Sequence, residues 1–239
     1  MLVLFDIDQT MISTSGAGRA AMELAGRDLF GDRFSARHIN FAGSIDPIVV
    51  AQLFEYAGVA NTVQNVAAFR RRYAARLHER LADPATGRTV LPGVLELLAR
   101  LRAQDAVTLG VLSGNYGETG RAKLAACGID PEWFRVSVWG DDAVGGYHGP
   151  GSAPCRDELP RVGLARYREL HGFDIESRRT VVVGDTPHDV RCALVNGCRS
   201  LAVATGAFDA AALAAAGAHR AVPDLSAVED VLGWILSAG

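Results

Sequence analysis

The stretch MLVLFDIDQT, residues 1–10, joins an apolar run of strand length to two carboxylates separated by one residue. Residues 2–5 are too apolar for an exposed N-terminus, so they predict a buried central strand that delivers Asp6 and Asp8 to the carboxyl edge of a sheet. Ligands of open parallel sheets bind at that edge. The spacing points both carboxyl groups to one side of an extended chain, where two anions need a cation or a shared proton between them. Mg²⁺ is the simplest such cation because it prefers oxygen ligands, and a turn with capping carboxylates is the alternative.

The composition limits the class of protein. With 239 residues, 49% of them hydrophobic and 21% charged, the chain can form one large domain or a core with an inserted subdomain. A net charge of −3 gives no electrostatic footprint for nucleic acid. Met1 leads directly into the strand without a signal peptide, and no apolar run is long enough to span a membrane. We therefore expect a cytoplasmic protein, a monomer or homodimer, that binds neither nucleic acid nor membrane.

The order of predicted elements points to an α/β fold with an insertion. Apolar residues recur at helical spacing over 17–30, 46–56 and 62–81, and no convincing strand is found between residues 12 and 88. A helix at 92–102, with Pro92 in its first turn, precedes strands at 107–112, 136–139, 180–183 and 200–203, each followed by a helix, and a short run near residue 221. This alternation predicts a doubly wound, Rossmann-like parallel sheet with helices on both faces. The expected core is residues 1–12 and 86–239, the expected all-helical cap is residues 13–85, and the Gly- and Pro-rich residues 145–154 predict a surface loop.

Two further strand ends carry polar residues. The run at 107–112 ends in Ser113-Gly114-Asn115, a hydroxyl and small backbone units ahead of a helix, where free N–H groups favour an oxyanion. The run at 180–183 ends in Gly184-Asp185-Thr186-Pro187-His188-Asp189, with Asp189 about one helical turn beyond Asp185. Either motif alone is compatible with ordinary helix capping. Three strands that end in polar residues at one edge of the sheet together indicate a functional site.

These motifs, in this order, resemble those of the haloacid dehalogenase-like (HAD) hydrolases, particularly the branch of phosphatases similar to phosphoglycolate phosphatase. Residues 6–10 look like the first motif of that family, residues 113–115 the second and residues 184–189 the fourth, so the resemblance runs along nearly the whole chain. It implies a HAD core with a helical cap inserted after the first strand. It also implies a Mg²⁺-dependent phosphatase acting on a small phosphorylated metabolite.

The chain departs from the family pattern at two places. Gln9 stands where the family usually has glycine. The third motif commonly supplies a lysine, but the only lysine of this chain is Lys123, on the helix after the second motif. We expect Arg156 to take the cationic role, with Arg161 as the second choice, and the exchange is not neutral because a guanidinium is a planar fork.

The resemblance assigns catalytic and metal-binding roles to the aspartates. Asp6 would attack phosphorus to form an aspartyl-phosphate, and Asp8 would protonate the leaving oxygen and then activate water. Mg²⁺ would be held by Asp6, the backbone carbonyl of Asp8, and Asp185.

The remaining roles concern the phosphoryl group. Ser113 and the Gly114 and Asn115 amides would bind its oxygens, while Arg156 would stabilise the developing charge and steady the nucleophile. Asp189 would contact the metal through water or through its ligands.

Other functions compete with a phosphatase. Residues 16–21, GAGRAA, fit a dinucleotide-binding pattern but follow no strand of the required kind, so connector glycines between core and cap are the preferred interpretation. A phosphomutase of the same superfamily and a non-catalytic, phosphate-responsive protein remain alternatives, whereas Asp8 argues against a dehalogenase. Residues 14–15 and 44–46 are the cap residues considered as candidates to face the leaving group. The four cysteines lack metal-ligand spacing and are expected to be reduced, structural thiols.

Overall fold

A buried strand, Leu2–Phe5 (β1), lies at the centre of the fold, as the sequence predicts. The computed structural model describes residues 1–143 and 155–237, so the loop expected at 145–154 lies outside the described residues. The other strands of the main sheet are Thr108–Leu112 (β4), Val136–Val138 (β5), Thr180–Gly184 (β6), Arg199–Val203 (β7) and Arg220–Val222 (β8). They lie in the order β5-β4-β1-β6-β7-β8, and all neighbouring pairs are parallel. The doubly wound α/β fold is confirmed, and the chain order reverses at β1, where such sheets bind ligands.

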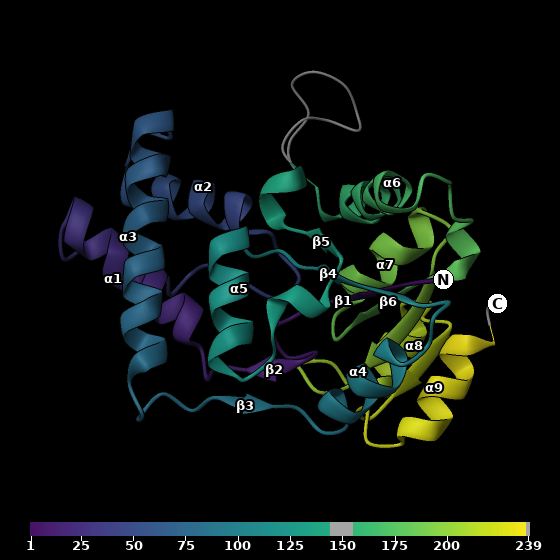
Figure 1. The fold of residues 1–239 in the computed structure, drawn as a ribbon. Coiled ribbons are helices and arrows are strands. Elements are labelled where there is room, and N and C mark those ends of the chain that lie inside the picture. Colours follow the sequence, from purple (N-terminus) through teal and green to yellow (C-terminus); the bar gives the residue numbers. More distant parts are fainter. Residues whose placement is uncertain (144–154, 238–239) are drawn as a thin grey trace.

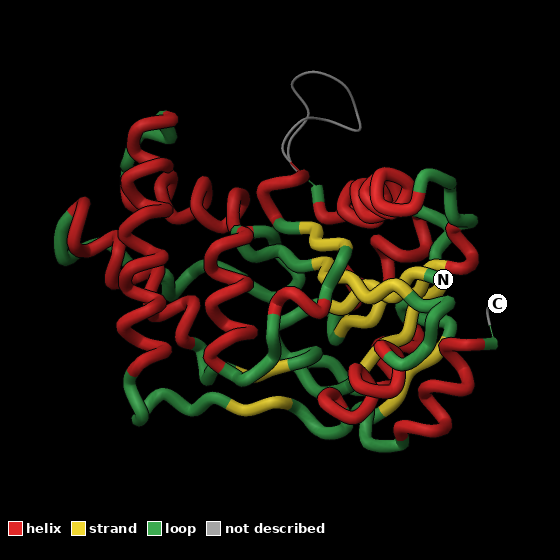
Figure 2. Tube along the Cα trace, viewed as in Figure 1, coloured by secondary structure: helices red, strands yellow, loops and turns green. Residues whose placement is uncertain are grey.

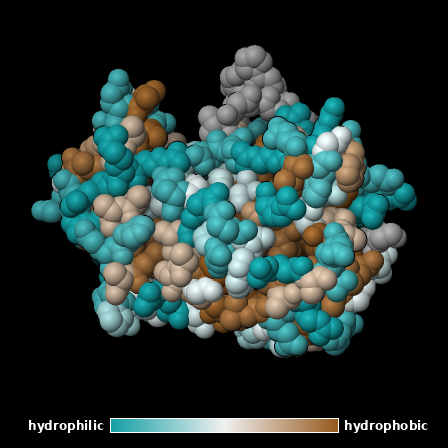
Figure 3. Space-filling view, viewed as in Figure 1, coloured by the Kyte–Doolittle hydropathy of each residue, from teal (hydrophilic) through white to brown (hydrophobic). Residues whose placement is uncertain are grey.

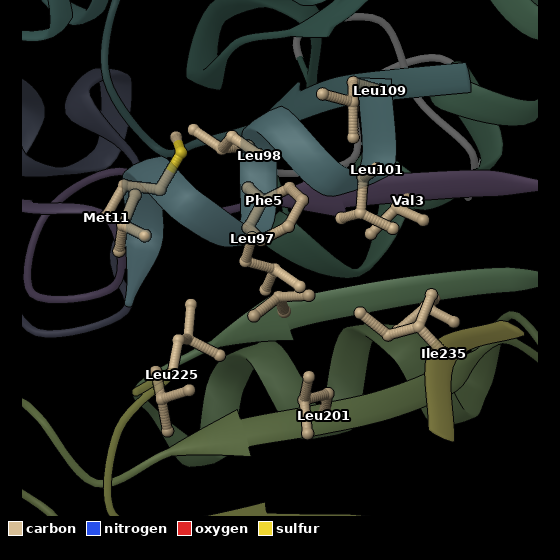
Figure 4. Packing of buried hydrophobic residues seen from close by; sticks show 14 of the residues in the cluster. Val3, Phe5, Met11, Leu97, Leu98, Leu101, Leu109, Leu201, Leu225 and Ile235 are labelled. Atoms are coloured by element: carbon tan, nitrogen blue, oxygen red, sulfur yellow. The ribbon is translucent and has the colours of Figure 1, made fainter. Parts of the chain in front are cut away.

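Helices cover both faces of this sheet (Figure 1). They are Val94–Arg102 (α4), Gly117–Ala126 (α5), Leu159–His171 (α6), Pro187–Val195 (α7), Ala210–Ala215 (α8) and Val228–Leu236 (α9), with 3-10 turns at Pro131–Trp133, Gly140–Ala143, Arg156–Glu158 and Ser177–Arg179. Val3 and Phe5 pack into an apolar cluster with α4 and α9 (Figure 4). Leu2 and Leu4 point to the opposite face, toward α6 and α7. Because successive residues of a strand face opposite sides, burial on both faces requires an apolar residue at every position of β1.

Three helices, Ala17–Phe30 (α1), Asp46–Ala57 (α2) and Val63–Ala82 (α3), form a separate helical lobe beside the sheet (Figures 1 and 2). The lobe has its own apolar cluster, in which the ring of Phe54 packs edge-on against Phe69 with centroids 5.4 Å apart. Phe34 packs directly over Gly26, where a Cβ would lie 2.0 Å from the ring. We keep residues 13–85 as the proposed extent of a cap domain.

Two local predictions are wrong. Residues 12–13 and 89–90 form a short antiparallel pair, Ile12–Ser13 (β2) and Thr89–Val90 (β3), beside the helical lobe. Two-residue strands carry no periodicity that a sequence pattern could reveal. Pro92 also precedes helix α4 instead of lying in its first turn, because Gly93 caps the helix with φ of 78° and its Cα packs against the backbone of Leu225.

The surface seen in Figure 3 is mostly hydrophilic, with smaller hydrophobic areas interspersed. Among the described residues, none of the helices combines the length and the apolar character needed to span a membrane. The four cysteines are unpaired, and Cys192 and Cys198 are buried, as expected for structural thiols.

Candidate active site

The polar ends of β1, β4 and β6 meet at the carboxyl edge of the sheet because these three strands are neighbours. The Asp6 amide donates to the Val183 carbonyl at 2.9 Å, so the β1–β6 ladder continues up to the first aspartate. A cavity of about 420 Å³ opens at this edge. Its walls include every residue that the sequence placed in the site, namely Asp6, Asp8, Ser113, Gly114, Asn115, Arg156 and Asp185. The helical lobe supplies the opposite wall through residues that include Thr14, Arg19, Met22 and Asp46.

A cluster of three buried carboxylates forms the floor of the cavity. One oxygen each of Asp6, Asp185 and Asp189 lie within 4.8 Å of one another. Burial raises the pKa of Asp6 to about 7, although the Arg156 charge opposes the shift. Burial, and next the charge of Asp6, raise the pKa of Asp185 to about 8. Three carboxylates this close together repel one another when they are ionised, and a divalent cation would offset that repulsion. Their oxygen atoms are the hard ligands that Mg²⁺ prefers.

Local backbone chemistry places Asp189. The Thr186 hydroxyl and the Asp189 carboxylate form a reciprocal capping box at the start of α7, with the Thr186 amide donating to Asp189 Oδ2 at 3.0 Å. Gly184 makes room for this arrangement, since a Cβ there would lie 2.2 Å from Asp189 Cγ. The capping interpretation is therefore correct for Asp189, and the same capping holds its carboxylate at the site.

Arg156 crosses the cavity floor. It is 7% exposed, and its Nη2 donates to Asp6 Oδ1 at 2.8 Å and to Asp189 Oδ1 at 2.5 Å. Burial opposes the charge, but the Asp189 and Asp6 carboxylates outweigh it and raise the pKa of Arg156. Arg161 is exposed on α6. Of the two candidate arginines, Arg156 is the one in contact with Asp6.

The second motif follows β4. A Cβ on Gly114 would lie 2.1 Å from the Ser44 carbonyl oxygen and 3.1 Å from Arg156 Nη1, so only glycine fits between the lobe and the arginine. Asn115 uses its side chain internally, because Nδ2 donates to Ser113 Oγ and to Asp8 Oδ2, both at 2.8 Å. The Asn115 amide contacts Ser113 Oγ at 3.4 Å.

Asp8 does not belong to the carboxylate cluster. Its side chain turns toward Asn115 and Lys123, and Lys123 Nζ donates to Asp8 Oδ2 at 2.6 Å. A metal contact through Asp8 would therefore use its backbone carbonyl, as the sequence resemblance implies. Gln9, the residue directly after Asp8, adopts φ of 61°. A left-handed residue there costs a non-glycine side chain roughly 1 kcal/mol, which explains the family preference for glycine.

The sequence interpretation missed two contributors to the site. Lys123 was noticed only as the sole lysine, and that singularity was the available clue. Gly206, in the loop after β7, lies against Asp185, since a Cβ there would be 1.8 Å from Asp185 Oδ2. No residue pattern near Gly206 marks this approach.

The helical lobe contacts the second motif directly. Asp46, the first residue of α2, donates its amide to the Gly114 carbonyl at 2.7 Å, and its Oδ2 accepts the Tyr116 amide at 2.8 Å. Burial raises the pKa of Asp46 to about 7, although the charge of Lys123 opposes the shift. Of the cap residues considered from the sequence, Ser44, Ile45 and Asp46 thus lie at the junction of lobe and core.

The chain is similar to known protein sequences. A profile of the haloacid dehalogenase-like hydrolases matches residues 3–194, and one described as HAD-hydrolase-like matches residues 162–228. A phosphoglycolate phosphatase of Rhodospirillum rubrum is 28% identical over 235 residues, which cover 97% of this chain and 90% of the relative. A Dickeya dadantii protein assigned as the phosphatase IndB is 31% identical over 209 residues, which cover 86% and 81%.

Solved structures share the fold. The crystal structure of CbbY from Rhodobacter sphaeroides in complex with phosphate superposes with a TM-score of 0.70 at 20% identity, covering 94% of each chain. A Thermotoga maritima protein assigned as a β-phosphoglucomutase gives 0.63 at 20% identity, covering 98% of each chain. At such identities the likeness establishes the architecture alone.

Proposed function

The chain belongs to the haloacid dehalogenase-like hydrolases, and we propose that it is a Mg²⁺-dependent phosphatase that hydrolyses a small phosphomonoester through an aspartyl-phosphate. It is an enzyme of the phosphatase class, since the relatives that it matches over most of their length are named as phosphatases. The metal, the covalent intermediate and the residue roles are the parts of this proposal that need experiment.

The observation that carries the proposal is the environment of Asp6. This carboxylate is buried at the end of the central strand, 2.8 Å from a guanidinium nitrogen and within 4.8 Å of two further carboxylates. A nucleophilic carboxylate needs cations nearby, because a phosphate dianion otherwise repels it. The donor set of Asp6 and Asp185, supported by Asp189 and the Asp8 carbonyl, would hold Mg²⁺, which would offset that repulsion.

The residues then divide the reaction between them. Asp6 attacks phosphorus while Asp8 gives a proton to the leaving oxygen, and Asp8 then takes a proton from the water that attacks the aspartyl-phosphate. Ser113 and the Gly114 amide bind phosphoryl oxygens, and Arg156 stabilises the charge that develops on them. The helical lobe excludes water and selects the leaving group.

The test is a screen of small phosphomonoesters with purified protein, with Mg²⁺ or with EDTA. We expect phosphate release that needs the metal and disappears in Asp6→Asn, since an amide is a poor nucleophile and a weaker ligand. Asp28→Asn is the matched control, because Asp28 is an aspartate of α1 that pairs with Arg72 and Arg76 on the surface of the lobe. Full activity in Asp6→Asn, or none in folded wild-type protein, would reject the proposal.

The second candidate is a phosphomutase, because a protein assigned as a β-phosphoglucomutase shares the fold. The two activities differ in whether water or a sugar phosphate accepts the phosphoryl group from Asp6. Incubation with hexose phosphates and a bisphosphate activator separates them, since a mutase interconverts the sugar phosphates and releases little inorganic phosphate. A non-catalytic, phosphate-responsive protein would instead accumulate phosphorylated Asp6 without turnover.

A further inference from the structure

A second polar network lies on the far side of Asp8 from the carboxylate cluster. Lys123 Nζ donates to Asp8 Oδ2 at 2.6 Å and to Asn115 Oδ1 at 2.6 Å. Asn115 Nδ2 donates to the same Asp8 oxygen at 2.8 Å and to Ser113 Oγ at 2.8 Å. Four residues from three parts of the chain are thereby joined around one carboxylate.

Lys123 is built into this network and closed off from solvent. It lies at the start of the last turn of α5, and its side chain extends toward the N-terminus of that helix, as helical side chains do, which brings the ammonium group to the carboxyl edge of the sheet. It is 5% exposed. A Cβ on Gly18 of α1 would lie 3.2 Å from Lys123 Nζ and 3.4 Å from the Tyr73 hydroxyl of α3, so the lobe packs directly against the ammonium group.

The charge balance explains why Lys123 stays with Asp8. A buried ammonium that loses its partner costs several kcal/mol, and Asp8 supplies that partner. Asp46 is buried nearby in α2, where burial raises its pKa to about 7 although the charge of Lys123 opposes that rise. Lys123 is thus held among acceptors that are already fixed by the fold, and a phosphate group is not needed to satisfy it.

Both nitrogen donors act on the same oxygen of Asp8. Each carboxylate oxygen has about two acceptor sites, so Oδ2 is fully occupied by Lys123 and Asn115. A proton carried by the Asp8 carboxyl is therefore carried on Oδ1. Among the described residues no hydrogen bond to Oδ1 competes with a substrate, and the side chain of Asp8 is 39% exposed on the cavity side.

We propose that Lys123, together with Asn115, is a positioning residue that fixes the Asp8 carboxyl with Oδ1 directed at the leaving-group oxygen; this inference rests on the proposed phosphatase function. In the first step the P–O bond to the leaving group breaks as the Asp6–phosphorus bond forms, and the proton of Oδ1 passes to the leaving oxygen. In the second step water attacks phosphorus, its proton returns to Oδ1, and inorganic phosphate and free Asp6 are formed.

The consequence is a dependence on the leaving group. p-Nitrophenolate leaves without protonation, whereas an alkoxide needs a proton. Lys123→Met keeps the length and removes the charge, so it should slow phosphorylation of Asp6 by an alkyl phosphate on the order of 100-fold and by p-nitrophenyl phosphate far less. Hydrolysis of the aspartyl-phosphate should slow with both substrates, because it uses Asp8 as a base, while KM changes little.

The experiment is rapid-quench kinetics of the full chain in Mg²⁺, with p-nitrophenyl phosphate and an alkyl phosphate found active in the screen. Lys123→Met should show a nitrophenol burst at nearly the wild-type rate, a slower steady state, and no burst with the alkyl substrate. Lys123→Arg should recover part of the alkyl rate. Arg121→Met, an exposed change on the same helix, should behave as wild type.

A crystal structure of Lys123→Met adds a readout independent of turnover, in which the Asp8 carboxyl should rotate or become disordered. An equal loss in the rate of Asp6 phosphorylation with both leaving groups, a raised KM alone, or wild-type kinetics would each overturn the role of Lys123 while leaving the phosphatase intact. Wild-type protein that hydrolyses neither substrate would reject the proposed function first, and this role with it.

Discussion

Arg156 and Lys123 take different positions around the two catalytic candidates Asp6 and Asp8. Arg156 contacts Asp6 and Asp189 at once, through the single nitrogen Nη2. Lys123 contacts Asp8 instead, from the helix that follows the second motif. We propose that Arg156 takes the place of the lysine that the third motif commonly supplies, and the only lysine of the chain contacts the other aspartate.

The first prediction at this scale concerns Arg156. Arg156→Ala should lower kcat on the order of 100-fold or more, because a positioned electrostatic donor beside the transferring phosphoryl group is lost. Arg156→Lys should recover part of the rate, and Arg161→Ala should be mild because that side chain is exposed. Steady-state kinetics in saturating Mg²⁺ measures all three variants. If Arg161→Ala lowers kcat severely while Arg156→Ala leaves kcat unchanged, then Arg161 and not Arg156 supplies the positive charge.

At the scale of elements, the contact between α2 and the turn before α5 links the helical lobe to the site. The first residue of α2 bonds to the backbone of the second motif on both sides of Asn115, through the Gly114 carbonyl and the Tyr116 amide. Helix α3 adds Arg70, which pairs with Glu118 and Asp141 of the core and stacks on the ring of Tyr116. The lobe therefore contacts the same turn that carries the second motif.

Asp46→Ala tests this junction. The variant loses a buried hydrogen bond to a carboxylate, worth roughly 1.5–3 kcal/mol, so closure should weaken and KM should rise about tenfold or more with a smaller change in kcat. Asp28→Ala, which removes ion pairs inside the lobe, controls for general loosening of its helices. Structures with and without a phosphate analogue provide the second measurement. A lobe that lies away from the cavity in every state, or an unchanged KM, would contradict the idea of a closing cap.

At the scale of the whole molecule, the site lies where two separately packed units meet. The sheet has an apolar cluster on each face, and the helical lobe has a third cluster of its own. Between them lie four buried carboxylates, Asp6, Asp46, Asp185 and Asp189, with only Arg156 and Lys123 as buried cations among the described residues. An excess of buried acid makes the stability of the protein depend on pH and on bound cations.

The direction follows from the raised pKa values. The pKa of Asp6 and of Asp46 is raised to about 7 and that of Asp185 to about 8, from 3.8 in each case. The folded protein therefore binds more protons than the unfolded chain above pH 4, so this contribution to stability is complete below that pH. This contribution is lost progressively as the pH rises through about 7 to 8, and at higher pH the stability no longer changes with these three groups.

Mg²⁺ should reverse this loss because it binds the ionised carboxylates. We expect the Tm in EDTA to fall between about pH 5 and about pH 8, and the gain in Tm on adding Mg²⁺ to be larger at the higher pH. Asp46→Asn should flatten the decline in EDTA but leave the gain from Mg²⁺, since Asp46 is outside the carboxylate cluster. Calorimetric scans measure both. An increase in Tm on adding Mg²⁺ that becomes smaller as the pH rises would contradict the proposal that these carboxylates bind Mg²⁺.

The sequence by itself determined the features that depend on local chemistry. The apolar run before Asp6 fixed the central strand, and its burial on both faces required a parallel sheet with helices on both sides. Parallel strands that end in polar residues necessarily deliver them to one edge, so Asp6, Ser113 and Asp185 could be placed together from their order along the chain. Arg156 directly precedes a helix at the point where the sequence predicts the cation, and its side chain contacts Asp6.

Only the tertiary structure decided contacts between elements whose distance depends on packing. Lys123 reaches Asp8 across 115 residues of chain, and Asp46 reaches Tyr116 across 70. Such pairs have no sequence period, because they follow from the docking of the helical lobe on α5. Gly18 shows the same limit: read as a connector glycine, it lies inside α1 and is small because Lys123 and Tyr73 occupy the space beside it. Periodicity and turn chemistry act over a few residues, whereas the surroundings of a buried charge are set by the whole fold.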